Sequence, residues 1–185
     1  KGKELDVPGR WDAGAKEKIH IGIEWLGGVH FGHIEAVGPR VLIIGVGNTA
    51  MDCCRTSKRL GATDVKVVAR RSRPYFKASP WELEDAEEEG VEIIENHAPK
   101  RFVIENGTLT GLEFERLSWT EDANGAQKST VVETVVIPCD AVILAIGQDN
   151  AFPWIERDVG IEFDQWEMPV VDKVTHQCSR EGVFF

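Results

Sequence analysis

A short aliphatic run followed at once by closely spaced glycines constrains this chain more than any other feature. Val41 to Ile44 are all aliphatic, and Gly45-Val46-Gly47-Asn48-Thr49-Ala50 follows without a break. Such a run is typical of a central strand that is buried on both faces of a parallel sheet. Helix-compatible residues continue to Leu60, and a second apolar strand is expected over 65–69. The order predicts a strand–turn–helix–strand unit with a right-handed crossover.

The glycine turn matches the Gly-x-Gly-x-x-Gly/Ala fingerprint in the context that a dinucleotide site requires. We expect Gly45 to permit the tight turn, Gly47 to let a pyrophosphate approach the backbone, and Ala50 to allow close helix–strand packing. The helix start at Asn48 and Thr49 would present free amides and the positive end of the helix dipole to the phosphates. The alternative is a glycine turn in an α/β domain that binds no ligand.

The end of the second strand indicates which dinucleotide would bind. An NAD site usually carries Asp or Glu there, whereas this chain has Arg70, Arg71 and Arg73 and no acid between Ala69 and Arg73. A carboxylate would repel a 2′-phosphate, and guanidinium groups bind it in bidentate fashion. We therefore expect NADP(H), with Arg71 as the main clamp and Arg70 or Arg73 assisting. The alternative is a solvated basic turn.

The remaining pattern alternates between helices and strands, with one interruption. Ile19, Ile23 and Leu26 predict a helix that Gly27-Gly28 ends, Ser79-Pro80 opens another, and a third strand is expected over 91–94. Asn106-Gly107 and Asn124-Gly125 predict two hairpins and hence a three-stranded antiparallel meander. A buried parallel strand returns over 141–146, and residues 149–185 are expected to form loops and short strands.

Composition excludes several classes of protein. The chain has 185 residues, of which 42% are hydrophobic and 28% charged, as in folded domains. Its net charge of -10 argues against a nucleic-acid partner. We find neither an apolar run of membrane-spanning length nor a signal peptide. Both ends read as cuts through a larger protein.

The cysteines and histidines do not indicate a metal site. Cys53, Cys54, Cys139 and Cys178 form no Cys-x-x-Cys pair, and we expect small buried thiols in a reducing cytoplasm. The alternative is a redox dithiol that lies elsewhere in the parent protein. The histidines near the N-terminus are expected on the surface or in loops, and the acidic run 82–89 on a solvated helix face. No catalytic side chain is predicted, because hydride transfer between cofactors needs alignment and exclusion of water.

The run from Arg40 to Cys53 resembles the NADPH-binding domain of the glutamate synthase small (β) subunit and of related flavin and iron–sulfur oxidoreductases, including dihydropyrimidine dehydrogenase. The resemblance extends through 70–73, 88–92 and 145–148, and implies a Rossmann-like FAD/NAD(P)-binding three-layer α/β fold. It places Ile146, Gly147 and Gln148 in the cofactor site. One departure is the segment 74–78, which replaces the family's usual Met-Pro-Ala.

The resemblance also implies a domain organisation and an electron path. Residues 1–37 would be a lead-in from an FAD domain plus a linker helix, 38–148 the NADPH-binding domain, and 149–185 a partial FAD-domain segment. The parent protein would pass electrons from NADPH through FAD and iron–sulfur clusters to a partner subunit in the cytoplasm. The first FAD fingerprint and the cluster cysteines would lie upstream.

Two other functions stay open at this stage. The same domain serves other acceptors in disulfide and ferredoxin reductases, and it can also be a non-catalytic nucleotide sensor. A Cys-x-x-Cys elsewhere in the parent would favour a disulfide reductase, and a DNA-binding module would favour a sensor.

Overall fold

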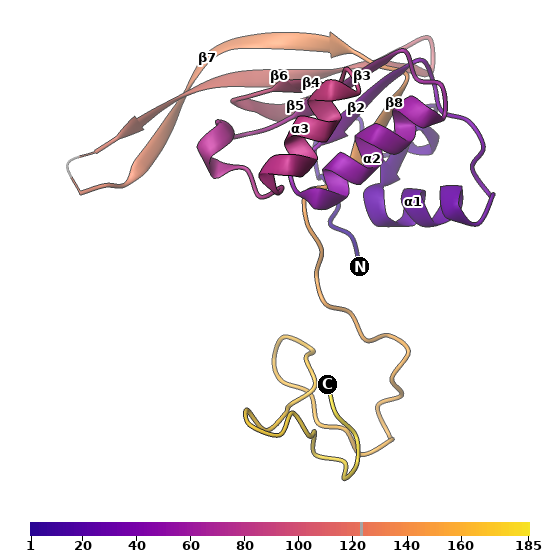
Figure 1. Ribbon diagram of the computed structural model, residues 1–185, viewed down its shortest axis with the longest axis vertical. Coiled ribbons are helices and arrows are strands. Elements are labelled where there is room, and N and C mark those ends of the chain that lie inside the picture. The colour runs from indigo at the N-terminus through magenta and orange to yellow at the C-terminus, as the bar shows by residue number, and fades with distance from the viewer. Residues whose placement is uncertain (123) are drawn as a thin grey trace. The chain divides into compact units, whose positions relative to one another are not determined.

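The computed structural model describes residues 1–122 and 124–185 (Figure 1). The chain divides into two compact units. The larger unit comprises Gly2–Gly147, and the smaller comprises Lys1 with Gln148–Phe185. The larger unit carries every named helix and strand.

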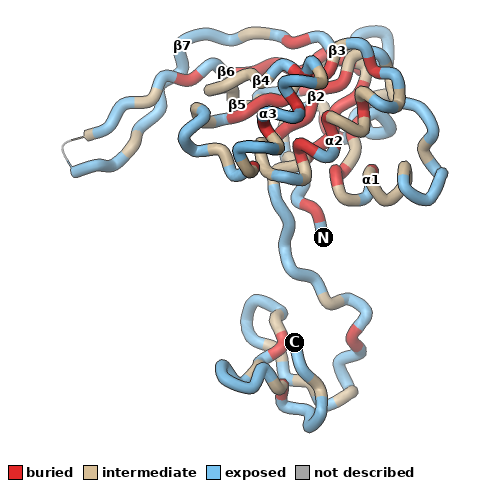
Figure 2. Tube along the Cα trace, viewed as in Figure 1, coloured by how far each residue is buried: buried red, intermediate tan, exposed pale blue. Residues whose placement is uncertain are grey.

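A five-stranded parallel sheet forms the centre of the larger unit. Its order is β1 (Ile19–Ile21), β8 (Ala141–Leu144), β2 (Arg40–Ile44), β3 (Asp64–Val68) and β4 (Glu92–Ile94). Leu42 pairs with Val142 on one side and with Lys66 on the other. The aliphatic run in β2 is therefore flanked by strands on both sides and buried, as predicted, and it appears red in Figure 2.

Helices cover one face of this sheet, and an antiparallel sheet covers the other. Val41 and Ile43 pack in one apolar cluster with residues of the helices, whereas Leu42 and Ile44 pack in a second cluster with Phe114 and its neighbours. The helices are α1 (Gly22–His30), α2 (Asn48–Arg59) and α3 (Pro80–Glu88), and two short 3-10 helices are η1 (Lys16–Lys18) and η2 (Arg73–Tyr75). This arrangement confirms the predicted three-layer α/β fold.

The predicted meander is also present. It consists of β5 (His97–Glu105), β6 (Thr108–Glu121) and β7 (Gln127–Pro138), paired in that order. Asn106 and Gly107 both have positive φ, 51° and 73°, as a two-residue hairpin turn requires. The far end of the β6–β7 hairpin projects beyond the rest of the larger unit (Figure 1).

The helix predicted to include Ile19 begins later than expected. Ile19–Ile21 forms β1 instead, because pairing with Val142 and Leu144 of β8 buries both isoleucines against the meander side. Gly27 and Gly28 do not end α1, which continues to His30. The prediction was wrong here because the strand partner lies more than a hundred residues away along the chain.

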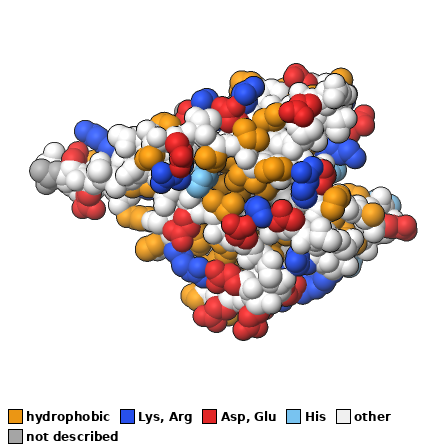
Figure 3. Space-filling model, turned by 90° about the horizontal axis from the view of Figure 1, so that it is seen from above, with side chains coloured by type: hydrophobic (Ala, Val, Ile, Leu, Met, Phe, Trp, Pro, Cys, Tyr) orange, Lys and Arg blue, Asp and Glu red, His pale blue; other side chains and the backbone are white. Residues whose placement is uncertain are grey.

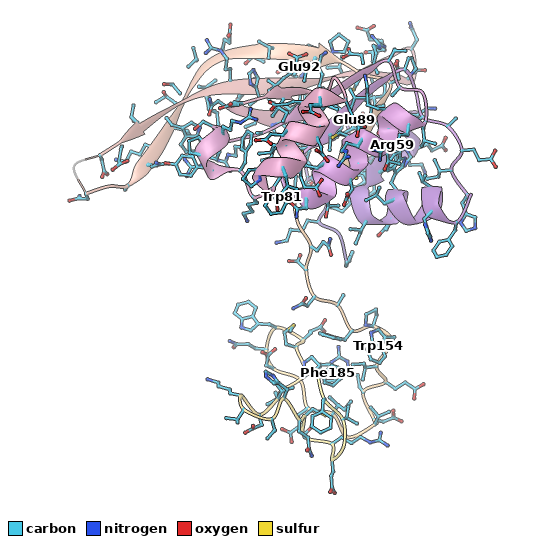
Figure 4. All side chains as sticks on the ribbon, in the orientation of Figure 1. Arg59, Trp81, Glu89, Glu92, Trp154 and Phe185 are labelled. Atoms are coloured by element: carbon cyan, nitrogen blue, oxygen red, sulfur yellow. The ribbon has the colours of Figure 1, made fainter. Side chains whose placement is uncertain are left out.

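The acidic run on α3 is only partly solvated. Arg55 of α2 forms ion pairs with Glu82, Asp85 and Glu89 at 3.2, 3.1 and 2.7 Å. Arg59 reaches the same Glu89 carboxylate at 2.7 Å, and the two side chains point toward one another in Figure 4. These contacts join α2 to α3. Within the described residues, no group of three or more His, Cys, Asp or Glu could hold a metal ion.

The smaller unit has little regular structure. Its strands are reduced to single bridges that join Phe163 to Pro169, Val171 to Cys178 and Gln177 to Phe184. Phe152 packs edge-on against Phe185 at 5.7 Å between ring centroids. These observations match the predicted loops and short strands, and the assignment of this unit to an FAD domain stays a prediction. No helix among the described residues is long and apolar enough to span a bilayer.

Candidate dinucleotide-binding site

The glycine turn between β2 and α2 lies at the carboxyl-terminal edge of the parallel sheet. Gly45 has a φ of +118°, and a Cβ there would lie 2.3 Å from the carbonyl oxygen of Ala145. Its amide donates to the carbonyl of Val68 at 3.1 Å. Gly45 is thus held between the ends of β3 and β8, where only glycine fits.

Gly47 has a different role in the same turn. Its backbone is extended, with φ -101° and ψ 176°, and a Cβ placed on it would meet nothing within 4 Å. Within residues 1–122 and 124–185, the amides of Val46, Gly47, Asn48 and Thr49 have no protein acceptor. Ala50 is fully buried beneath them. An open approach to four free amides at a helix N-terminus is the arrangement that binds phosphate.

A cavity of about 390 Å³ adjoins this turn. It lies beyond the ends of β2 and β3, where an open α/β sheet binds its ligands. Its wall is mainly aliphatic, with Arg70 and His97 as the two side chains that can be charged. Three of the predicted site residues, Gly45, Arg70 and Ile146, line it, together with residues that the sequence did not single out: Leu5, Ile44, Val68, His97, Ala98 and Pro99.

The three arginines after β3 differ in their surroundings. The guanidinium of Arg73 donates to both carboxylate oxygens of Glu87 at 2.7 and 2.6 Å, and this ion pair raises the pKa of Arg73 and lowers that of Glu87. Arg71 donates to the side chain of Gln127 at 2.5 Å. Arg70 is exposed, and no hydrogen bond or ion pair joins it to the described part of the chain. Arg73 is therefore the least available of the three for a phosphate.

The segment that departs from the family's pattern is fastened to the glycine turn. The amides of Lys77 and Ala78 both donate to the carbonyl of Val46, at 3.1 and 2.9 Å. The side-chain oxygen of Asn48 accepts from the amide of Ser79 at 2.9 Å. Asn48 thus serves first to join the turn to the start of α3, a role that local sequence does not indicate.

The end of β8 supplies the other predicted residues. Ile146 lines the cavity. Gly147 has a φ of +112°, and its carbonyl accepts from the amide of Lys3 at 3.0 Å. Gln148 belongs to the smaller unit, so its predicted place in the site stays a prediction.

The cysteines have no feature of a reactive pair. All four are free and buried. Burial raises the pKa of the Cys53, Cys54 and Cys139 thiols to about 12, so these thiols stay protonated at neutral pH. Among the predicted surface histidines, His20 is instead half-buried, and burial lowers its pKa.

Comparison with known proteins identifies the family. The profile of the pyridine nucleotide-disulphide oxidoreductases matches residues 2–185. The chain belongs to this family. It is 36% identical over 176 residues to the NADPH-Fe(3+) oxidoreductase subunit beta of Geobacter sulfurreducens, covering 93% of this chain and 26% of that protein. It is 37% identical over 157 residues to the glutamate synthase (NADPH) small chain of Azospirillum brasilense, covering 83% of this chain and 32% of that protein.

Solved structures of this family's fold agree with the architecture. Thioredoxin reductase of T. acidophilum superposes with a TM-score of 0.69 at 18% identity, over 100% of this chain and 53% of the other. FprA of Mycobacterium tuberculosis, a His57Gln mutant, superposes with a TM-score of 0.71 at 14% identity, over 99% and 54%. This chain therefore spans about half of those proteins and less of the curated relatives. The resemblance to the glutamate synthase small subunit and the expected oxidoreductase family are confirmed.

Proposed function

We propose that this chain is the NADPH-binding module of a flavin-dependent oxidoreductase of the glutamate synthase small-subunit type. One observation supports the proposal above all: an open glycine turn, a cavity and two arginines without a carboxylate partner in the described chain, Arg70 and Arg71, lie at the same edge of the parallel sheet. Relatives support the choice of nucleotide by name: two above are named for NADPH, and a 37% identical protein of Moorella thermoacetica is an NADP(+)-dependent formate dehydrogenase subunit beta.

Each part of an NADP(H) molecule would have its own set of residues in this site. The free amides from Val46 to Thr49 would hold the pyrophosphate, and the bare face of Gly47 would let it approach. The cavity lined by Ile146 and Arg70 would take the adenosine half. Arg71, with Arg70 assisting, would bind the 2′-phosphate. When bound, the nicotinamide supplies a hydride, and the chain's contribution is to orient it and exclude water.

The later electron carriers lie outside these residues in our proposal. FAD and iron–sulfur clusters would be held by other parts of the parent protein. For the clusters, the proposal is supported by the burial of the four cysteines and by the lack of a metal-type grouping among residues 1–122 and 124–185. A cytoplasmic location and an electron-accepting partner subunit complete the proposal. The partner is supported by the names of the relatives, which are a subunit and a small chain. The surface drawn in Figure 3 intermixes acidic and basic side chains, which gives no support to a nucleic-acid partner.

Nucleotide affinities in the full-length protein test this proposal. We expect the wild type to bind NADPH more tightly than NADH. Arg71→Ala should weaken NADPH about tenfold or more, since a charge-assisted contact contributes roughly 1.5–3 kcal/mol. The dissociation constant for NADH should barely change, because NADH lacks the 2′-phosphate. Raising salt should weaken NADPH more than NADH.

A matched control separates the site from bulk charge. Arg59→Ala removes an exposed arginine at the other end of α2, where it pairs with Glu89, and should leave both affinities unchanged. Equal losses of NADPH and NADH in Arg71→Ala would assign this arginine to the fold instead of the phosphate. A wild type that prefers NADH would overturn the proposal.

A further inference from the structure

The β6–β7 hairpin contacts the arginine loop through Arg71. The guanidinium carbon of Arg71 lies over the ring of Trp119 on β6, 3.8 Å from the centroid, and over the ring of Tyr75 at 4.8 Å. Its Nη1 donates to Oε1 of Gln127, the first residue of β7, at 2.5 Å. The amide nitrogen of Gln127 donates in turn to the Tyr75 hydroxyl. Four side chains from three segments thus form one connected group, which we term the Arg71 cage.

The Arg71 cage holds the arginine without neutralising it. The carboxylate of Glu87 cancels the charge of Arg73, whereas aromatic rings and a neutral amide attract a guanidinium and leave its positive charge in place. A guanidinium has five N–H donors, and the described contacts of Arg71 use one of them. Arg71 is therefore fixed, charged and able to donate further bonds.

An arginine in this state is prepared to bind an anion. A free arginine side chain must be immobilised when its ligand binds, and that loss of freedom reduces affinity. Arg70 has no contact of this kind with the described part of the chain. In Arg71 the hairpin has already fixed the rotamer, so less freedom is lost on binding.

We propose that Trp119 and Gln127 are positioning residues that determine specificity for the 2′-phosphate of NADPH. They act through Arg71 and do not touch the nucleotide themselves. This inference rests on the proposed function, and it adds the projecting hairpin to the cofactor site. The length of the β6–β7 hairpin would then serve the cofactor site, since Trp119 and Gln127 lie near the far end of that hairpin.

Single substitutions in the full-length protein test the cage. Trp119→Ala and Gln127→Ala should each weaken NADPH binding by about fivefold, as expected for losing a cation–π contact or a hydrogen bond to a charged group, while NADH changes by less than about twofold. Trp119→Phe keeps a ring and should keep most of the affinity. Thr120→Ala is the matched control. Thr120 is exposed and directly follows Trp119 on β6, and its side chain faces the opposite side of the sheet because side chains alternate along a strand. Thermal unfolding shows whether each variant is folded.

A double-mutant cycle shows whether the hairpin acts through the arginine. In an Arg71→Ala background, adding Trp119→Ala should cause no further loss of NADPH affinity. Additive losses, or equal losses of NADPH and NADH, would mean that Trp119 contacts the nucleotide or supports the fold, and would overturn the inference.

The outcomes separate this inference from the proposed function. If Arg71→Ala removes the NADPH preference but Trp119→Ala and Gln127→Ala do not, the proposed function stands and the inference fails. If the wild type shows no preference for NADPH, both fail.

Discussion

Two glycines in one turn have different surroundings. At Gly45 the backbone has positive φ and lies against Ala145, so a side chain is excluded by the fold itself. At Gly47 the backbone conformation is ordinary and the space beyond it is open. The fold therefore requires the first glycine, whereas the second is the position at which we propose that the nucleotide approaches, a distinction that the fingerprint alone does not make.

Substitution at the two positions should give opposite results. We expect Gly47→Val to reduce NADPH binding about tenfold or more with little change in melting temperature, because its side chain occupies only the space that the pyrophosphate needs. Gly45→Ala should destabilise the fold by roughly 1–3 kcal/mol. Calorimetric titration and thermal unfolding of both variants check this. Normal NADPH binding by folded Gly47→Val would disprove the phosphate assignment.

An ion pair joins β2 and β8 at the amino-terminal ends of the strands, opposite the glycine turn. Arg40 at the start of β2 donates to both carboxylate oxygens of Asp140, which directly precedes β8, at 3.0 and 2.6 Å. The Arg40 amide also donates to this carboxylate at 3.0 Å. These bonds hold the pKa of Asp140 below its usual value. The carboxylate therefore stabilises the fold only while it is ionised.

The pH dependence of stability reports on this pair. Because the pKa of Asp140 is lower in the folded than in the unfolded chain, its contribution is complete above the ordinary value of 3.8 and disappears as the pH falls through the lower, folded value. Asp140→Asn should lower the melting temperature at pH 7, and the gap to the wild type should narrow in acid. Glu84→Gln, on the exposed side of α3, is the control. A gap independent of pH would exclude this linkage.

Elements with local signals were predictable, and those that depend on distant partners were not. Asn106-Gly107 specifies its own turn, and the aliphatic run of β2 specifies burial by itself. β1 was mistaken for helix because its strand state depends on β8. In the same way, the arginines were visible in the sequence, but the Arg71 contact with Gln127, 56 positions away, was not.

At the scale of the whole molecule, burial accounts for the behaviour of the cysteines. Cys53 and Cys54 lie in the core between the sheet and the helices, and Cys139 lies in the core on the meander side. Burial raises the pKa of each to about 12. Their reactivity should therefore depend on unfolding and not on local chemistry.

Thiol titration tests this at pH 8. In a Cys178→Ser background, three thiols remain in each chain. We expect less than about one tenth of all thiol groups in the native sample to react quickly with a thiol reagent, because only thiolates react. All three should react in denaturant. A fast native thiol at Cys53 or Cys54 would reopen a redox role for this adjacent pair.

The strand order sets a sequence of events for folding. β8 is the last strand of the larger unit along the chain, yet it lies between β1 and β2. Ile19 pairs with Val142 in the folded chain, so β1 cannot join the sheet before residue 142 has been synthesised. Contacts of such long range slow folding. A nascent chain stopped before residue 141 should leave one edge of β2 and all of β1 unpaired, and hence open to proteases.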